Sequence, residues 1–209
     1  MTDMQKVRNR TESLLFSEGV PLHPNLPVIE NVSLRAGEDV AKKIVALYAM
    51  AGLANGADGE SLREWLMEEN GWNYLSTEDK LKLESVSLSQ TDLNELSWKQ
   101  ESLYALSWSG SLIGKMIWPD SEANLESVFD LIPPEKPIKS FVRNFVLRPE
   151  RELVEELDLY YCLHAAAVHP ELWGRKDMKL KMEVILERRQ ALEWLCSMSI
   201  EWKDIPLDT

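Results

Sequence analysis

Apolar side chains recur along most of this chain at spacings of three and four residues, which is the period of an α-helix. Between residues 38 and 53, Val40, Ile44, Leu47 and Ala51 fall on one helix face. The alternation typical of a half-buried strand is nowhere sustained. The pattern therefore predicts an all-α fold of about seven to nine helices. The seven clearest predicted helices cover residues 3–18, 38–53, 59–70, 77–85, 92–109, 149–168 and 177–199.

Short polar motifs mark where several of these helices begin and end. Asp58 is suited to cap the helix that follows it, and Ser76 with Asp79 has the pattern of a capping box. Gly71 is expected to take the left-handed conformation that ends the preceding helix. Three prolines between residues 20 and 27 hold that segment extended. Helices are therefore expected to alternate with fixed, irregular connections.

The helices are expected to form one domain that covers residues 1–209. Because 44% of the residues are apolar, a chain of this length can bury a full core. The proline-rich segment 133–137 is the one candidate linker, but it is short, and related tryptophan-containing segments lie on both sides of it. We interpret it as a loop within the domain.

Eight tryptophans are the most distinctive feature of the composition. Two segments that end in Trp108 and Trp194 share the pattern Glu-x-x-x-Ala-Leu-x-Trp, which places a large indole near a small alanine. We expect Trp98, Trp108 and Trp194 to anchor packing between helices. Three of the tryptophans outside the predicted helix interiors would mark a partner surface if exposed: Trp72, Trp118 and Trp202.

The net charge of −12 is concentrated in the middle of the chain, where residues 58–135 hold 16 acidic and 5 basic side chains. Such a segment repels nucleic acid, so general nucleic-acid binding is not expected. It attracts basic partners, and we expect the partner to be another protein. The alternative is a solvated acidic face that serves only solubility.

Nothing in the sequence predicts export or a membrane span. The first ten residues are charged rather than apolar, and the longest apolar run, residues 44–54, is about half a membrane span. Cys162 and Cys196 lie in apolar helical segments without a metal-binding spacing, so we expect two free, buried thiols. These features predict a cytoplasmic protein.

Familiar catalytic and cofactor motifs are absent from the sequence. The segment from Gly110 to Met116 has the wrong glycine spacing for a phosphate loop and follows a predicted helix rather than a strand. The segment 55–60 lacks the alternating acids of a calcium loop. Three histidines leave little room for a catalytic zinc site. We therefore expect neither a cofactor nor a metal, and no catalytic residue is assigned.

One cluster of polar residues on two long predicted helices comes closest to chemistry. Asp158 lies in an otherwise apolar segment, where an unpaired carboxylate is costly to bury, so Arg188 or Arg189 is its expected partner. One interpretation is a pocket for a polar ligand or metal, and the favoured alternative is a buried network that fixes how the helices dock. The candidate residues are Asp158, Tyr161, His164, Glu187 and Arg188.

Several segments resemble the bacterial domain-of-unknown-function 4272 family. The most specific is the C-terminal block from Glu187 to Thr209, and Glu193 and Lys99 depart from residues common in that family. The resemblance implies one full-length domain, but no activity, cofactor or catalytic residue. The other matching segments are RTESLL at 10–15, LRAGEDVA at 34–41, WKQESLYALSW at 98–108, WPD at 118–120 and LDLYYCLH at 157–164.

The leading functional hypothesis is a non-catalytic module that binds another protein. The absent catalytic motifs, the many indoles and the acidic middle segment favour this hypothesis, and a regulatory or immunity-like protein that neutralises a basic partner is one version of it. The alternative is a small-molecule or metal-dependent site, enzymatic or not, built from Asp158, His164, Glu187 and Arg188. The oligomeric state is left open.

Overall fold

The fold of the described residues is all-α, as the periodicity predicts. The computed structural model describes residues 2–174 and 179–208, which contain nine α-helices and three short 3-10 helices but no sheet. Within these residues, no helix combines the length and apolar character needed to cross a bilayer. The first residues of the predicted helix 177–199 lie outside the described ranges, and that helix is described from Met182.

The described residues gather into two compact units. Unit 1 contains Met1–Arg35, Ile117–Glu122 and Arg148–Thr209, and unit 2 contains Ala36–Met116 and Ala123–Leu147. The proline-rich segment 133–137 lies inside unit 2, between two of its helices. A single domain for the whole chain stays a prediction.

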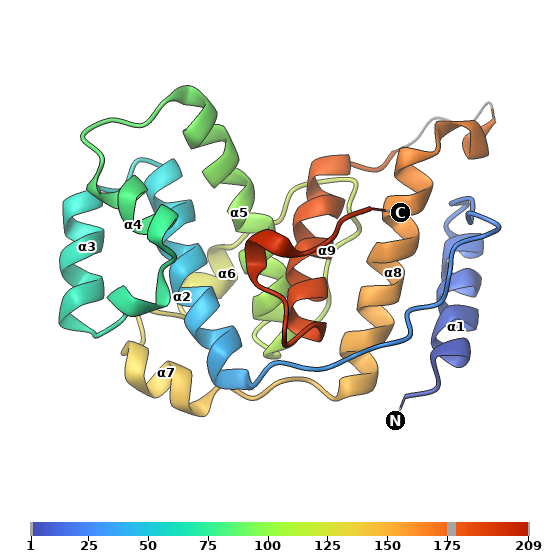
Figure 1. The fold of residues 1–209 in the computed structure, drawn as a ribbon, viewed down its shortest axis with the longest axis horizontal. Coiled ribbons are helices and arrows are strands. Elements are labelled where there is room, and N and C mark those ends of the chain that lie inside the picture. Colours follow the sequence, from blue (N-terminus) through green and yellow to red (C-terminus); the bar gives the residue numbers. More distant parts are fainter. Residues whose placement is uncertain (1, 175–178, 209) are drawn as a thin grey trace. The chain divides into compact units, whose positions relative to one another are not determined.

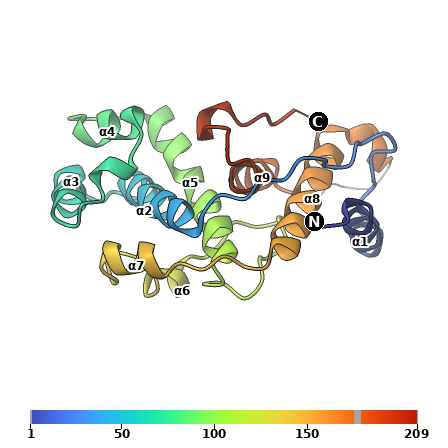
Figure 2. The ribbon, with the colours of Figure 1, turned by 60° about the horizontal axis from the view of Figure 1, so that its bottom comes forward.

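Unit 1 is built around one long central helix. Figures 1 and 2 show α8 between α1 and α9, and α8 packs against both. Helix α8 has buried side chains all around its axis, including Leu153, Leu157, Leu159 and Cys162, as a helix flanked on two sides requires. The elements of unit 1 are α1 (Met4–Ser17), α8 (Glu150–Val168), η2 (Pro170–Trp173), α9 (Met182–Cys196) and η3 (Trp202–Asp204).

The end of α9 is closed by a distant segment of the chain. The backbone N–H groups of Ser33 and Arg35 donate to the carbonyls of Cys196 and Leu195 at 2.8 and 2.9 Å, and Met198 N donates back to Ser33 O at 2.9 Å. These bonds use carbonyls that have no partner within the helix. The residues before α2 thus serve as a cap for α9.

Unit 2 is centred on the packing of α2 against α5. The last two turns of α5 are buried all around, and the buried carboxylate of Glu101 accepts a hydrogen bond from Ala123 N at 2.7 Å. The elements of unit 2 are α2 (Gly37–Ala54), α3 (Gly59–Glu68), η1 (Trp72–Tyr74), α4 (Thr77–Glu84), α5 (Gln90–Ser109), α6 (Glu126–Phe129) and α7 (Ile138–Asn144).

The predicted starts of two helices in unit 2 are confirmed, and one predicted helix end is wrong. Asp58 caps α3, and Ser76 and Asp79 form the capping box of α4. The left-handed residue after α3 is Asn70, with φ 60°, whereas Gly71 is ordinary backbone. Gly71 is needed for space instead, because a Cβ there would lie 2.8 Å from Ile138 Cδ1.

Candidate functional site

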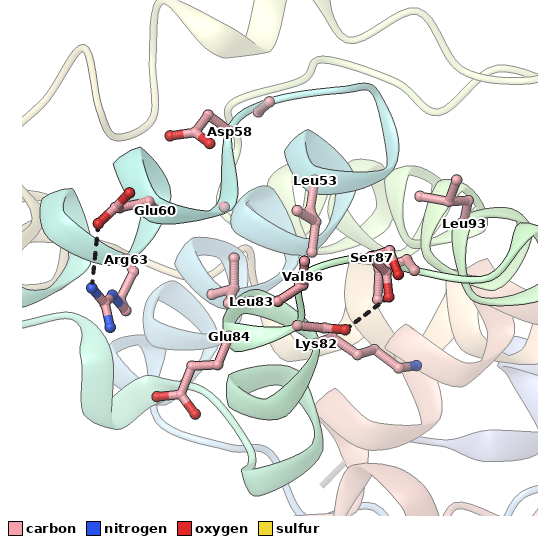
Figure 3. Close-up of a pocket in the computed structure, with 14 residues that line it drawn as sticks. Leu53, Asp58, Glu60, Arg63, Lys82, Leu83, Glu84, Val86, Ser87 and Leu93 are labelled. Carbon is pink, nitrogen blue, oxygen red and sulfur yellow. Dashed lines mark hydrogen bonds and ion pairs between the residues drawn. The ribbon is translucent and has the colours of Figure 1, made fainter.

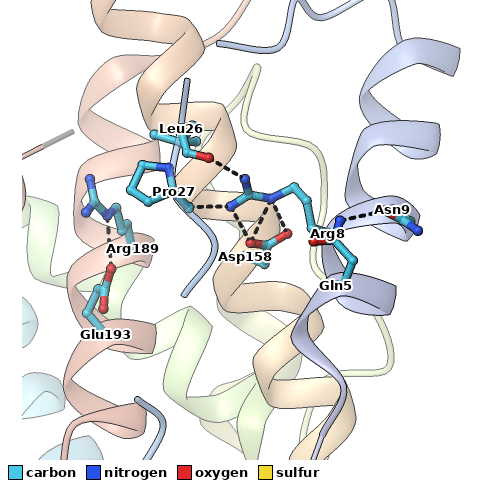
Figure 4. Close-up of polar contacts among 8 residues, drawn as sticks. All are labelled: Gln5, Arg8, Asn9, Leu26, Pro27, Asp158, Arg189 and Glu193. Carbon is cyan, nitrogen blue, oxygen red and sulfur yellow. Dashed lines mark hydrogen bonds and ion pairs between the residues drawn. The ribbon is translucent and has the colours of Figure 1, made fainter. Parts of the chain in front are cut away.

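Asp158 lies in the middle of α8, fully buried, and its partner is Arg8 of α1 (Figure 4). Arg8 Nη2 donates to Asp158 Oδ1 at 2.8 Å, and Arg8 Nε lies 3.2 Å from both carboxylate oxygens. The prediction that Arg188 or Arg189 pairs with Asp158 is therefore wrong. The sequence held a signal for the correct partner, because Arg8 lies on the same helix face as the buried Thr11 and Leu15.

The rest of the Arg8 guanidinium is used to hold the extended segment that follows α1. Arg8 Nη1 donates to the carbonyl of Leu26 at 2.9 Å, and Nη2 donates to that of Pro27 at 3.0 Å. A planar guanidinium has enough fixed donors to serve a carboxylate and two carbonyls at once. Arg8 thus connects two helices and the proline-rich segment.

Arg189 of α9 holds the C-terminal segment in a similar way. It donates to the carbonyls of Leu207 and Asp208 at 3.3 and 3.0 Å, and its Nε lies 3.3 Å from Glu193 Oε1. Its Nη1 also contacts Nδ1 of the buried His164. Because Arg189 can only donate, Nδ1 accepts, so the neutral imidazole carries its proton on Nε2.

Burial and the nearby Arg189 charge lower the pKa of His164 from 6.5 to about 4. At neutral pH, His164 therefore contributes a hydrogen-bond acceptor rather than a charge. A group of this kind suits a packed network better than proton transfer near pH 7.

Acid is expected to weaken the fold through His164. Above pH 6.5 the histidine is neutral in both states, but below it the unfolded chain takes up a proton that the folded protein accepts only near pH 4. The contribution of neutral His164 to the free energy of unfolding is thus fully present above pH 6.5. Up to about 3 kcal/mol of it is lost as the pH falls to 4. Urea unfolding between pH 7 and 4 should show a smaller decrease in the free energy of unfolding for His164→Gln than for the wild type. An equal loss in both proteins would contradict this assignment, and His169→Gln, which alters a partly exposed histidine, is the control.

Tyr161 lies beside both arginines. The guanidinium carbons of Arg8 and Arg189 lie 5.9 and 4.8 Å from the centroid of its ring, which is within the range of cation–π attraction. Tyr161 is half-buried, and burial raises the pKa of its hydroxyl group. The structure thus brings Asp158, Tyr161 and His164 together through Arg8 and Arg189.

Arg188 makes contacts separate from this network. It is fully buried, and its Nη1 donates to Tyr160 Oη at 2.9 Å and to the Ile117 carbonyl at 2.7 Å. Glu187 is half-buried on α9. The predicted set is therefore divided within unit 1.

A third arginine in unit 1 also binds backbone carbonyls. Arg35 Nε donates to the Trp194 carbonyl at 2.8 Å, Nη2 donates to Ser197 O at 3.2 Å, and Nη2 also contacts Ile200 O. Its guanidinium carbon lies 4.2 Å from the centroid of the Trp194 ring. We refer to Arg8, Arg35 and Arg189 as the arginine clamps, because each ties an irregular segment to a helix.

These contacts favour the packing interpretation of the polar residues. The clamps direct their donors at carboxylates and backbone carbonyls, which leaves little of their hydrogen-bonding capacity for a ligand. The buried thiol of Cys162 lies near Asp158, and burial raises its pKa to about 12, so it is not a thiolate at neutral pH. In the described ranges, no group of three or more histidine, cysteine or acidic side chains is arranged to hold a metal ion.

A groove in unit 2 is the second candidate place for a ligand (Figure 3). Its volume is about 530 Å³, and Leu53, Leu83 and Leu93 are among the residues that line it. The two cations on its wall already have partners, because Arg63 pairs with Glu60 at 3.8 Å and Lys82 pairs with Glu78 at 2.9 Å. The groove thus presents no unpaired cation to an anionic ligand.

The most exposed aromatic cluster of unit 2 combines rings from three helices. Tyr48 of α2 lies edge-on to Trp65 of α3 and to Phe129 of α6, with ring centroids 5.8 and 5.9 Å apart. Phe129 is 41% exposed, and the other two rings are half-buried. Exposed aromatic groups of this kind are typical of interaction sites.

Carboxylates accompany each of these rings. Glu64 and Glu68 lie near Trp65 in the sequence of α3, and Glu126 and Asp130 lie near Phe129. Burial raises the pKa of the Tyr48 hydroxyl group, and the charge of Glu135 raises it further. All five side chains are exposed, and none makes an ion pair with another described residue. We define the aromatic–acidic surface as Tyr48, Trp65, Phe129, Glu64, Glu68, Glu126, Asp130 and Glu135.

The tryptophans predicted from the sequence to form a partner surface are different ones. Trp72, Trp118 and Trp202 are all half-buried, and Trp202 packs edge-on against Trp194 with centroids 5.5 Å apart. Trp65 is not among the tryptophans predicted to form a partner surface. The acidic residues on both sides of Trp65 were the sequence signal for this surface. The rings of Tyr48 and Phe129, which complete it, come from distant segments of the chain.

The predicted packing anchors differ in burial. Trp108 and Trp194 are almost completely buried, whereas Trp98 is half-buried in α5. The alanine and leucine of each repeated pattern are also buried in α5 and α9. The glutamates are not equivalent, because Glu101 is buried and Glu187 is half-buried.

Comparisons with known proteins agree with the resemblance in the sequence. A family model described as "Domain of unknown function (DUF4272)" matches residues 7–205, which is nearly the whole chain. No curated protein and no solved structure matches the chain. The match includes all three arginine clamps and the whole aromatic–acidic surface. The chain therefore belongs to the DUF4272 family.

Proposed function

We propose that this protein is a non-catalytic, cytoplasmic module that binds a basic partner protein through the acidic surface of unit 2. The observation that carries the proposal is the group of five exposed carboxylates without ion pairs beside three partly exposed aromatic rings. Unpaired charge of one sign speeds the encounter with an oppositely charged partner, and aromatic rings supply affinity after contact. A regulatory or immunity-like role, in which a basic protein is neutralised, follows from this chemistry.

The arrangement of unit 1 is consistent with a scaffold for such a module. The arginine clamps Arg8 and Arg189 pair with buried polar groups and with backbone carbonyls, so these contacts stabilise the fold rather than a substrate. The contacts of the polar residues predicted to bind a ligand or metal therefore do not support that role.

The proposal is tested by affinity capture from cells of the source organism, followed by reconstitution with the purified partner. A basic protein should be retained at about 0.05 M salt and released at about 0.5 M, because screening weakens attraction between exposed charges. A variant in which the five surface carboxylates are replaced by amides should lose the partner. The control is Glu38→Gln with Glu84→Gln, which removes two exposed charges elsewhere in unit 2. The proposal fails if repeated captures recover no common basic protein, or if the amide variant binds as tightly as the control.

A further inference from the structure

We refer to Trp65, Tyr48 and Phe129 as the aromatic row, because the Tyr48 ring contacts both of the other rings. The Tyr48 ring lies edge-on to both Trp65 and Phe129, at 5.8 and 5.9 Å between centroids. Side chains four residues apart on a helix are separated by about 5–6 Å. A helix with apolar residues at every fourth position over two to three turns therefore has the spacing of this row.

Four of the five carboxylates are placed near the two ends of the row. Glu64 and Glu68 lie one and three residues from Trp65 on α3, and Glu126 and Asp130 lie three and one residues from Phe129. Residues three apart on a helix are neighbours on its surface, so Glu68 lies near Trp65 and Glu126 near Phe129, whereas Glu64 and Asp130 are next to these rings in sequence. Four carboxylates thus lie near the two end rings, and the fifth, Glu135, lies near the middle ring.

Two basic residues are close in sequence to these carboxylates and do not cancel them. Arg63 pairs with Glu60 at 3.8 Å rather than with the neighbouring Glu64. Lys136 follows Glu135 and makes no ion pair with another described residue. The five carboxylates therefore keep a net negative charge at the surface.

The geometry points to a basic amphipathic helix of the partner as the occupant of the aromatic–acidic surface. Its apolar stripe packs on the three rings, and lysine or arginine side chains at both ends of the stripe pair with the carboxylates. The inference rests on the proposed function, because it names the element of the partner that the acidic surface receives.

The first measurement uses fluorescence anisotropy with a labelled synthetic helical peptide of about four turns. The peptide carries leucines at every fourth position and lysines at both ends. The wild-type protein should bind it, and binding should weaken at least about tenfold when glutamates replace the lysines or when a central proline breaks the helix. Absence of binding overturns the inference, and equal binding of the proline peptide shows that the occupant is not a helix.

The second measurement uses matched variants of the protein. Phe129→Ala should weaken peptide binding about tenfold, whereas Phe16→Ala, which removes a more exposed ring from α1, should not. The double variant Glu64→Gln, Glu68→Gln should bind the peptide more weakly, and its affinity should depend less on salt. The control double variant Glu38→Gln, Glu84→Gln should show smaller changes in the affinity and in its salt dependence. Circular dichroism confirms that each variant is folded.

The two proposals fail in different ways. If the native partner is lost by the carboxylate variant but retained by Phe129→Ala, the acidic surface binds the partner without the aromatic row, and only the helix inference is wrong. If neither variant changes binding of the native partner, both proposals are wrong. If both variants lose the partner and the peptide, both proposals are supported.

Discussion

Replacing Arg8 with methionine is expected to lower the free energy of unfolding by about 3–5 kcal/mol. The change leaves the carboxylate of Asp158 fully buried without its cation, and it removes the donors to the Leu26 and Pro27 carbonyls. Methionine has a similar length, so most of the effect comes from lost polar contacts rather than from a cavity. Urea unfolding followed by circular dichroism measures the change.

Two further variants separate this effect from a general effect of charge. Arg10→Met removes an exposed arginine on the same helix that pairs with Glu155 at 3.3 Å, and it should cost less than about 1 kcal/mol. Combining Arg8→Met with Asp158→Leu should restore part of the lost stability, since no buried charge is then left unpaired. If Arg8→Met costs no more than Arg10→Met, the buried pair does not have the role described above.

Replacing Trp194 with alanine is expected to lower the free energy of unfolding by about 3–5 kcal/mol. The indole is only 7% exposed, contacts the guanidinium of Arg35 and packs against Trp202. Its removal leaves a cavity at the point where the C-terminal segment turns back over α9. Thermal and urea unfolding should both show the loss.

The control for this prediction is Trp98→Ala, which removes an indole that is half-buried in α5. Less apolar surface is withdrawn from water at this position, so the cost should be smaller by at least about 1 kcal/mol. Equal costs at the two positions would show that burial of the indole is not what decides its contribution.

The positions of the helices could be predicted from the sequence because each depends on local pattern. Apolar spacing defined the face of α2, and side-chain caps such as Asp58 and Ser76 defined where α3 and α4 begin. The end of α3 was predicted incorrectly because both asparagine and glycine tolerate positive φ. Asn70 takes this conformation, whereas Gly71 lies in a crowded position with ordinary φ.

The partners of polar residues could not be predicted in the same way. Periodicity shows which face of α8 carries Asp158, but it does not show which helix covers that face. Arg8 lies 150 residues away, and an arginine nearer in sequence was the more obvious candidate. The aromatic–acidic surface was missed for the same reason, since its three rings come from three separate helices.

The division of the chain between the two units has a consequence for folding during synthesis. Every segment of unit 2 has been made once residue 147 has left the ribosome, whereas unit 1 still lacks α8 and α9 at that point. Arg8 precedes its carboxylate by 150 residues, which corresponds to roughly 8–30 s of translation. Helix α1 therefore spends this time without its partner helix, and unit 2 has its complete sequence before Asp158 is made.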